Sequence, residues 1–239
     1  MPKGPVLVSG FPNMRNVSKL VAECLIKDLS AKPRKVIPSE HLADAPPRIV
    51  IEDGIGRLVQ YGFYEAKANG TDLVIVTGDS QPSTSEGYFA LAQEILTEAQ
   101  ALKVQRIFTV GSYGVPWEPK EPRVLGLAND KDLLKEVLDK GVNKCDDGGP
   151  ITGLEAILPA LAQARAIPSA LLMVETRWEP GTYLLPDPRA ARAGVLALGR
   201  ILGAGLEGKW LQSLPKMAVI QDKEEAQEEK EKEEIPGYR

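Results

Sequence analysis

The chain has 239 residues, of which 43% are hydrophobic and 26% are charged, and its formal net charge is −4. This composition excludes a disordered chain, and its longest apolar runs fall far below the roughly 20 residues that a membrane span requires. Two cysteines and one histidine exclude a disulfide framework and a Cys-based or His-based metal site within one chain. We therefore expect a cytoplasmic protein with no metal, no cofactor and no membrane partner.

The net charge is concentrated near the C-terminus. Eight of the 33 acidic residues and four of the 29 basic residues lie from position 221 onward, which leaves 25 of each sign in the body. A formally neutral body does not indicate a nucleic-acid-binding surface. We expect a single α/β domain over residues 1–212, followed by a charged tail over residues 213–239.

The N-terminal part of the chain shows a strand, a helix and a hairpin in turn. The β-branched run VLVS at residues 6–9 predicts a buried strand. Apolar residues then recur at helical spacing over residues 16–30, with Asn16 as a candidate N-cap and Cys24 as a core residue on the apolar stripe. Two extended runs within residues 48–66 flank Glu-Asp-Gly-Ile-Gly, which predicts a β-hairpin.

The central part repeats the order of strand and helix. The continuous run LVIV at residues 73–76 predicts a strand that is buried on both faces. Residues 85–104 predict an amphipathic helix with Phe89 on its apolar side, and the serines and threonine just before it are candidate caps. A short buried strand is then expected from residue 106, ending in a Gly-rich loop at residues 111–116.

The C-terminal part adds two strands and three helices. Strands are expected at residues 123–130 and 168–176. Helices are expected over residues 131–141, 148–167 and 187–203. Gly141 marks the end of the first helix, Pro159 kinks or interrupts the second, and Pro188 occupies an early position of the third.

Strands that alternate with helices, together with one hairpin, predict a three-layer α/β/α sandwich with a mainly parallel, mixed sheet. The loops at the strand ends would gather on one edge, which is where open α/β sheets bind ligands. The candidate ligand site at that edge comprises Asp79, Ser80, Gln81, Gly111, Tyr113 and Thr152. No Gly-x-Ser-x-Gly elbow surrounds Ser80, so no catalytic residue is assigned, and a capped turn is the alternative reading of that loop.

Six segments in this order resemble the proteasome assembly chaperone family, specifically its archaeal homologues. They are VSGFP (8–12), LVIVTGDSQPS (73–83), EGYFALAQEIL (86–96), RIFTVGSYG (106–114), PITGLEAILPALA (150–162) and LPDPRAARAGVLALGRILG (185–203). The resemblance implies an α/β fold similar to the phosphorylase and hydrolase-like sandwiches. It also implies a homo-oligomer that binds α-subunits of the twenty-S proteasome during assembly.

The resemblance also suggests a role for the last residues of the chain. Some family members end in a hydrophobic-Tyr-any motif that inserts into pockets between α-subunits, and Tyr238 and Arg239 match its last two positions. Gly237 departs from the motif, which removes a contact worth roughly 1–2 kcal/mol per tail. Ile235 is a candidate substitute for that contact. The alternative is a solvated, charged terminus.

Three functions remain open at this stage. The first is a non-enzymatic chaperone or adaptor that binds proteasome α-subunits as a homo-oligomer. The second is a phosphorylase-like or hydrolase-like enzyme that acts on a small phosphate-containing or nucleoside-containing ligand near Asp79. The third is an oligomeric scaffold unrelated to proteasomes. Similarity of fold to phosphorylases transfers no activity by itself.

Overall fold

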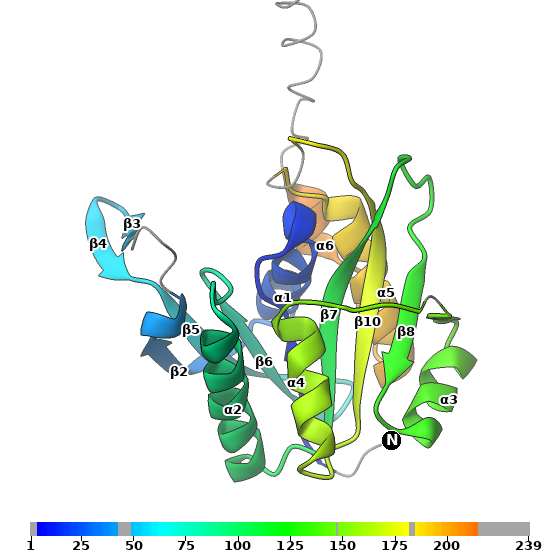
Figure 1. Ribbon diagram of the computed structural model, residues 1–239, viewed down its shortest axis with the longest axis horizontal. Coiled ribbons are helices and arrows are strands. Elements are labelled where there is room, and N and C mark those ends of the chain that lie inside the picture. Colours follow the sequence, from blue (N-terminus) through cyan, green and yellow to red (C-terminus); the bar gives the residue numbers. More distant parts are fainter. Residues whose placement is uncertain (1–3, 43–48, 147, 182–184, 215–239) are drawn as a thin grey trace, which may run out of the picture.

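A computed structural model of the chain describes residues 4–42, 49–146, 148–181 and 185–214. Their centre is an eight-stranded sheet with the spatial order β2-β5-β6-β1-β7-β10-β8-β9 (Figure 1). Its strands are β1 (Val6–Ser9), β2 (Lys32–Pro38), β5 (Gln60–Ala68), β6 (Thr71–Gly78), β7 (Arg106–Val115), β8 (Val124–Ala128), β9 (Asn143–Lys144) and β10 (Ser169–Arg177). The four central strands, β6, β1, β7 and β10, run parallel, while β2, β5 and β8 pair antiparallel to their inner neighbours.

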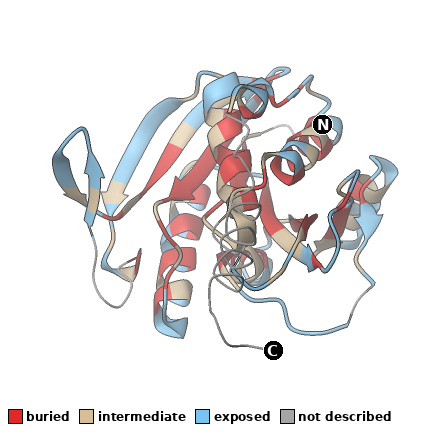
Figure 2. Ribbon diagram, turned by 90° about the horizontal axis from the view of Figure 1, so that it is seen from above, coloured by how far each residue is buried: buried red, intermediate tan, exposed pale blue. Residues whose placement is uncertain are grey.

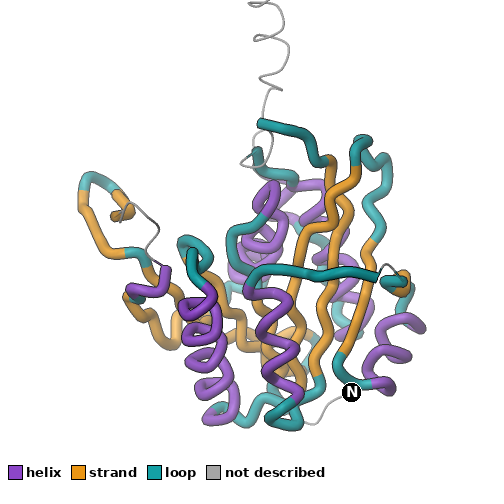
Figure 3. Tube along the Cα trace, viewed as in Figure 1, coloured by secondary structure: helices purple, strands orange, loops and turns teal. Residues whose placement is uncertain are grey.

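Helices cover both faces of this sheet (Figures 1 and 3). One face carries α1 (Val17–Asp28), α5 (Pro188–Leu202) and the short α6 (Lys209–Ser213), and the other face carries α2 (Ser85–Ala101) and α4 (Leu154–Gln163). The remaining helix, α3 (Lys131–Asp139), packs beside β8. The predicted three-layer α/β/α sandwich with a mixed sheet is therefore confirmed.

The central strand β1 explains why the apolar runs in the sequence are continuous. Val6 and Val8 face the core beneath α1 and α5, whereas Leu7 faces the core beneath α2 and α4, and all three side chains are fully buried. Figure 2 shows the same pattern, with buried residues along the central strands and helices. Because successive side chains point to opposite faces, a strand between two helical layers directs its side chains into a core on both sides.

The structure extends one predicted strand and adds two, β2 and β9, that were not predicted. The segment from Gly111 to Gly114, expected as a loop, belongs to β7, because β10 pairs with β7 as far as Val115. Edge strand β2 gave no strand signal, because its two prolines and two lysines are residues that disfavour a central strand. Such residues are typical of edges, where they prevent pairing with other chains.

Helix starts follow the expectations with one exception. Thr84 caps α2 by accepting a hydrogen bond from the Gly87 N–H at 3.1 Å, as expected of that loop. At the start of α1 the Asn16 side chain makes no cap hydrogen bond, because its backbone is left-handed (φ 56°). Instead Asn13 Oδ1 accepts from the Ser18 N–H at 3.1 Å. The predicted cap at Asn16 is therefore wrong by three residues.

Two expectations about helix interiors are also corrected. Phe89, placed on the apolar side of α2, has 48% of its surface exposed, because the buried face of the helix follows Gly87, Leu91 and Ile95 instead. Pro159 does not interrupt α4, which continues from Leu154 to Gln163. The Glu155 carbonyl, which an N–H at position 159 would normally satisfy, accepts a hydrogen bond from Thr109 Oγ1 at 2.7 Å.

The predicted hairpin is present, but only over residues 49–58, as a separate two-stranded sheet of β3 (Ile49–Glu52) and β4 (Ile55–Leu58). The rest of its second predicted run, residues 60–66, belongs to β5 of the main sheet. Asp53 and Gly54 form its turn, with φ angles of 51° and 81°, as a tight hairpin turn requires. The hairpin stands off the main body beside β5 and the short helix η2 (Glu40–Leu42) (Figure 1). None of the described helices is long and apolar enough to cross a membrane.

Candidate functional site

A cavity of about 490 Å³ opens at the carboxyl end of the central strands, on the α4 side of the sheet. Four segments far apart in sequence form most of its wall: residues 12–14 after β1, Gln81 after β6, residues 111–114 of β7, and residues 148–153 before α4. Parallel strands bring these ends together, because their carboxyl ends meet at one edge of the sheet. The cavity therefore occupies the edge where the sequence predicted a ligand site.

Gln81 connects three of these segments. Its Nε2 donates to the Pro12 carbonyl at 2.8 Å and to Glu155 Oε2 at 3.0 Å, and its Oε1 accepts from the Leu154 N–H at 2.9 Å. The amide thus satisfies one of the free backbone donors at the start of α4. One side chain holds the loop after β1 and the N-terminus of α4 in fixed positions relative to β6.

Glu155 lies in the first turn of α4 at the inner wall of the cavity. Burial of this carboxyl raises its pKa to about 7, although hydrogen bonds from its own backbone N–H, from Gln81 and from Asn13 favour the ionised form. Among the described residues that line the cavity, Glu155 has the only charged side chain. A carboxyl with a pKa near 7 can either accept or donate a hydrogen bond close to neutral pH.

Gly111 provides the space that Glu155 occupies. A Cβ atom at position 111 would lie 3.4 Å from Glu155 Cγ and 3.2 Å from Leu171 Cδ1, so a larger side chain would displace both neighbours. The glycine therefore permits close packing of α4 onto β7 beneath the cavity.

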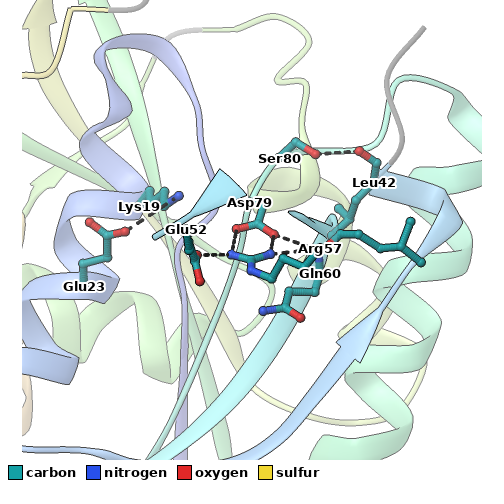
Figure 4. Close-up of polar contacts among 9 residues, drawn as sticks. Lys19, Glu23, Leu42, Glu52, Arg57, Gln60, Asp79 and Ser80 are labelled. Carbon is teal, nitrogen blue, oxygen red and sulfur yellow. Dashed lines mark hydrogen bonds and ion pairs between the residues drawn. The ribbon is translucent and has the colours of Figure 1, made fainter. Parts of the chain in front are cut away.

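A second cavity, also of about 490 Å³, lies between α1, β5 and the β3–β4 hairpin. Asp79 is the centre of its polar contacts (Figure 4). Asp79 accepts hydrogen bonds from Arg57 Nη1 at 2.6 Å, Arg57 Nη2 at 3.2 Å and the Gln60 N–H at 2.8 Å. Arg57 Nη2 also donates to Glu52 Oε1 at 2.5 Å. This network ties the hairpin to the end of β6.

Asp79 stays ionised in this network. Burial raises the pKa of its carboxyl, but the hydrogen bonds from Arg57 and from the Gln60 N–H outweigh burial and the net pKa is lowered. The same contacts raise the pKa of Arg57. Neighbouring Ser80 is buried and its Oγ donates to the Leu42 carbonyl at 2.6 Å. Both side chains are engaged in contacts that fix the backbone around them.

Comparison with known proteins identifies the family. The family model described as the PAC2 family matches residues 7–231. The chain belongs to the PAC2 family. This result confirms the resemblance that the six sequence segments indicated.

Solved structures resemble this PAC2 protein over almost its whole length. PbaB of Pyrococcus furiosus, described as an archaeal proteasome activator, is 30% identical with a TM-score of 0.77, and the match covers 98% of this chain and 96% of PbaB. PbaA of the same organism, described as an archaeal homolog of proteasome-assembly chaperone, is 23% identical with a TM-score of 0.73, over 96% and 90% of the two chains. Likeness to PbaA at this identity shows the fold alone.

A curated relative supports the same assignment. The uncharacterized protein MJ1210 of Methanocaldococcus jannaschii is 30% identical over 189 residues, which cover 79% of this chain and 70% of that protein. Its description names no activity, so it adds support for the family and none for a particular function.

The structure separates the predicted edge residues of this PAC2 protein into two groups. Gln81, Gly111, Tyr113 and Thr152 all line the cavity beside α4. Asp79 lines the other cavity, and Ser80 is buried against Leu42. The tail residues Ile235, Gly237, Tyr238 and Arg239 lie outside the described residues.

Sequence reasoning missed Glu155 and Arg57, the two charged residues that define these cavities. An acidic residue in the first turn of a helix is common, so the position of Glu155 carried no distinctive signal. Arg57 lies in a hairpin strand, 22 residues before its partner Asp79. The sequence did hold a signal for the cavity wall itself. Gly111 and Tyr113 are two positions apart, so in a strand they lie on the same face of the sheet.

Proposed function

We propose that this PAC2 protein is a non-enzymatic proteasome assembly chaperone or adaptor, which works in the cytoplasm as a homo-oligomer and binds proteasome α-subunits. The observation that carries the proposal is its 30% identity to PbaB, an archaeal proteasome activator, over 98% of the chain. Because the alignment with PbaB covers nearly all of both chains, nearly every surface that PbaB could use for binding has a counterpart in this chain. Membership of the PAC2 family supports the same proposal.

The C-terminal tail is the proposed anchor on the α-subunits. A segment that becomes ordered on docking loses conformational entropy, so it needs concentrated contacts. Tyr238 offers an aromatic ring with few rotatable bonds, and the terminal carboxylate of Arg239 offers a charge for a basic partner. Several tails on one oligomer would add avidity to a weak individual contact.

The enzyme alternative gains no support from the two residues on which it depended. Asp79 is paired with Arg57, and the Ser80 hydroxyl donates to a backbone carbonyl. No histidine contacts either residue among the hydrogen bonds and ion pairs of the described chain. Both residues are explained by the stability of the hairpin and of the loop after β6.

A pull-down with purified proteasome α-subunits tests the proposal. We expect the intact chain to bind, and we expect binding to fall at least tenfold when residues 237–239 are removed or in Tyr238→Ala. Tyr238→Phe is the matched control, because it keeps the ring. Binding that is unaffected by truncation would reject the tail as the anchor, and no binding by the intact chain would reject the chaperone assignment itself.

A further inference from the structure

The two faces of the β3–β4 hairpin differ in chemistry. The register pairs Ile49 with Leu58 and Ile51 with Gly56, so these four residues share one face, called here the outer face. The opposite, inner face carries Val50, Glu52, Ile55 and Arg57. A hairpin on a protein surface normally directs its apolar side chains inward and its charged ones toward solvent. This hairpin has both charged side chains on the inner face.

The inner face is fixed to the body. Arg57 donates to both carboxylate oxygens of Asp79, and Val50 packs against the core beneath α2. The Gln60 carbonyl also accepts from the Asp79 N–H at 3.0 Å, which joins the start of β5, two residues after the hairpin, to the end of β6. These contacts prevent the hairpin from turning over to bury its aliphatic side chains.

The outer face is aliphatic and exposed. Ile49, Ile51 and Leu58 expose 58%, 68% and 64% of their surface, and the face contains no charged residue. Figure 2 shows the hairpin as an exposed projection at one end of the molecule. A two-stranded sheet is marginally stable in water when no other surface covers it. A cluster of exposed aliphatic side chains on such a sheet marks an interaction site.

We infer that the outer face packs against the outer face of a second copy of this chain. An uncharged aliphatic surface is complementary to itself, which is what a two-fold contact between identical chains requires. The Ile49 side chain lies across Gly56, since a Cβ at position 56 would be 3.0 Å from Ile49 Cδ1, so aliphatic atoms also cover the glycine. Contact between two such faces would therefore be aliphatic throughout.

The area of the face sets the expected strength of the contact. The three aliphatic side chains expose roughly 300–400 Å² per copy, so two faces bury roughly 600–800 Å², about half of a standard interface. The outer face is therefore the apolar centre of an interface that also has a polar rim. A contact of this size dissociates on dilution.

Charge argues against the acidic tail as the occupant. Eight acidic residues lie between position 221 and the C-terminus, and the outer face has no basic residue to pair with them. The inference rests on the self-association in the proposed function, and it does not depend on binding to α-subunits.

Sedimentation of the full chain over a range of micromolar concentrations tests the inference. We expect the wild-type mass to rise with concentration, and we expect Ile51→Glu to weaken self-association at least tenfold, because a two-fold contact would bury the new charge twice. Ile55→Glu is the matched control: it makes the same substitution in the same hairpin, at a residue that is 72% exposed and on the inner face. Circular dichroism checks that both variants fold.

Each outcome decides between the two proposals. Loss of association in Ile51→Glu and in Leu58→Glu but not in Ile55→Glu supports the outer face as the interface. If the wild-type chain associates and Ile51→Glu does not weaken the association, this interface is overturned. The same holds if Ile55→Glu weakens the association as much as Ile51→Glu does. In both cases self-association itself stands. A wild-type chain that is monomeric at every concentration overturns both. Loss of α-subunit binding in Ile51→Glu with unchanged mass assigns the face to the α-subunit and overturns the inference.

Discussion

The carboxyl of Glu155 is held where its protonation state changes near neutral pH. Its pKa is about 7 in the folded protein, compared with 4.5 for an unperturbed glutamate, and burial is the main cause. A folded state with the higher pKa binds the proton more tightly than the unfolded state. This group therefore contributes stability that is fully present below about pH 4.5 and is lost as the pH rises through 7.

The first prediction concerns the pH dependence of stability at this residue. We expect Glu155 to lower the free energy of unfolding by about 1–3 kcal/mol between pH 5 and pH 8. Glu155→Gln keeps a polar side chain beside Gln81 but cannot ionise. The free energy of unfolding of this variant should therefore change less between pH 5 and pH 8, by that amount. Urea unfolding at both pH values measures it. Glu86→Gln, at an exposed position in the first turn of α2, is the control, and an equal slope in all three proteins would contradict the burial argument.

Helix α4 shows how a proline is tolerated inside an element. Pro159 has no N–H to donate to the Glu155 carbonyl, and Thr109 Oγ1 on β7 supplies the missing hydrogen bond at 2.7 Å. The hydroxyl comes from a neighbouring strand that is 46 residues away in sequence. No local pattern could reveal it, which is why the sequence predicted a kink or an interruption at Pro159.

The second prediction tests this compensation by a double-mutant cycle. Thr109→Val keeps the shape of a fully buried side chain and removes its hydroxyl, so the Glu155 carbonyl loses its partner and stability should fall by about 1–3 kcal/mol. In the background of Pro159→Ala, the N–H of Ala can donate to that carbonyl. The cost of Thr109→Val should then be smaller by about 1 kcal/mol or more, as measured by urea unfolding. Additive costs would show that Pro159 and Thr109 are not coupled.

The same contrast between local and distant signals runs through the other elements. Continuous apolar runs predicted the buried parallel strands, because a strand covered on both faces has no polar side. Strand β2 and the second half of β7 were missed, because prolines, lysines and glycines mask a strand whose position is fixed by pairing with β5 or β10. Capping signals predicted the start of α2 but not of α1, where a left-handed Asn16 moves the cap to Asn13.

At the scale of the whole molecule, the fold followed from the alternation of elements, and the cavities did not. Each cavity wall combines segments that are tens of residues apart, and their meeting depends on strand order, which periodicity does not contain. The strand order placed β1 between β6 and β7, so the loop after β1 reaches Gln81 and Glu155. The sequence predicted that these loops gather at one edge of the sheet but not that their residues divide between two faces.

The third prediction concerns Gly237 in the C-terminal tail and its effect on binding to α-subunits. If the tail docks in α-subunit pockets, Gly237 leaves the hydrophobic position of the motif empty, and Gly237→Leu should fill it. Burial of the new side chain is worth roughly 1–2 kcal/mol per tail, so binding should tighten about tenfold, and more if several tails of one oligomer bind together. Gly237→Ser is the control, because it removes the same backbone freedom without adding an apolar side chain. Binding to immobilised α-subunits measures the three chains side by side, and equal affinity of the Leu and Ser variants would exclude a hydrophobic pocket at this position.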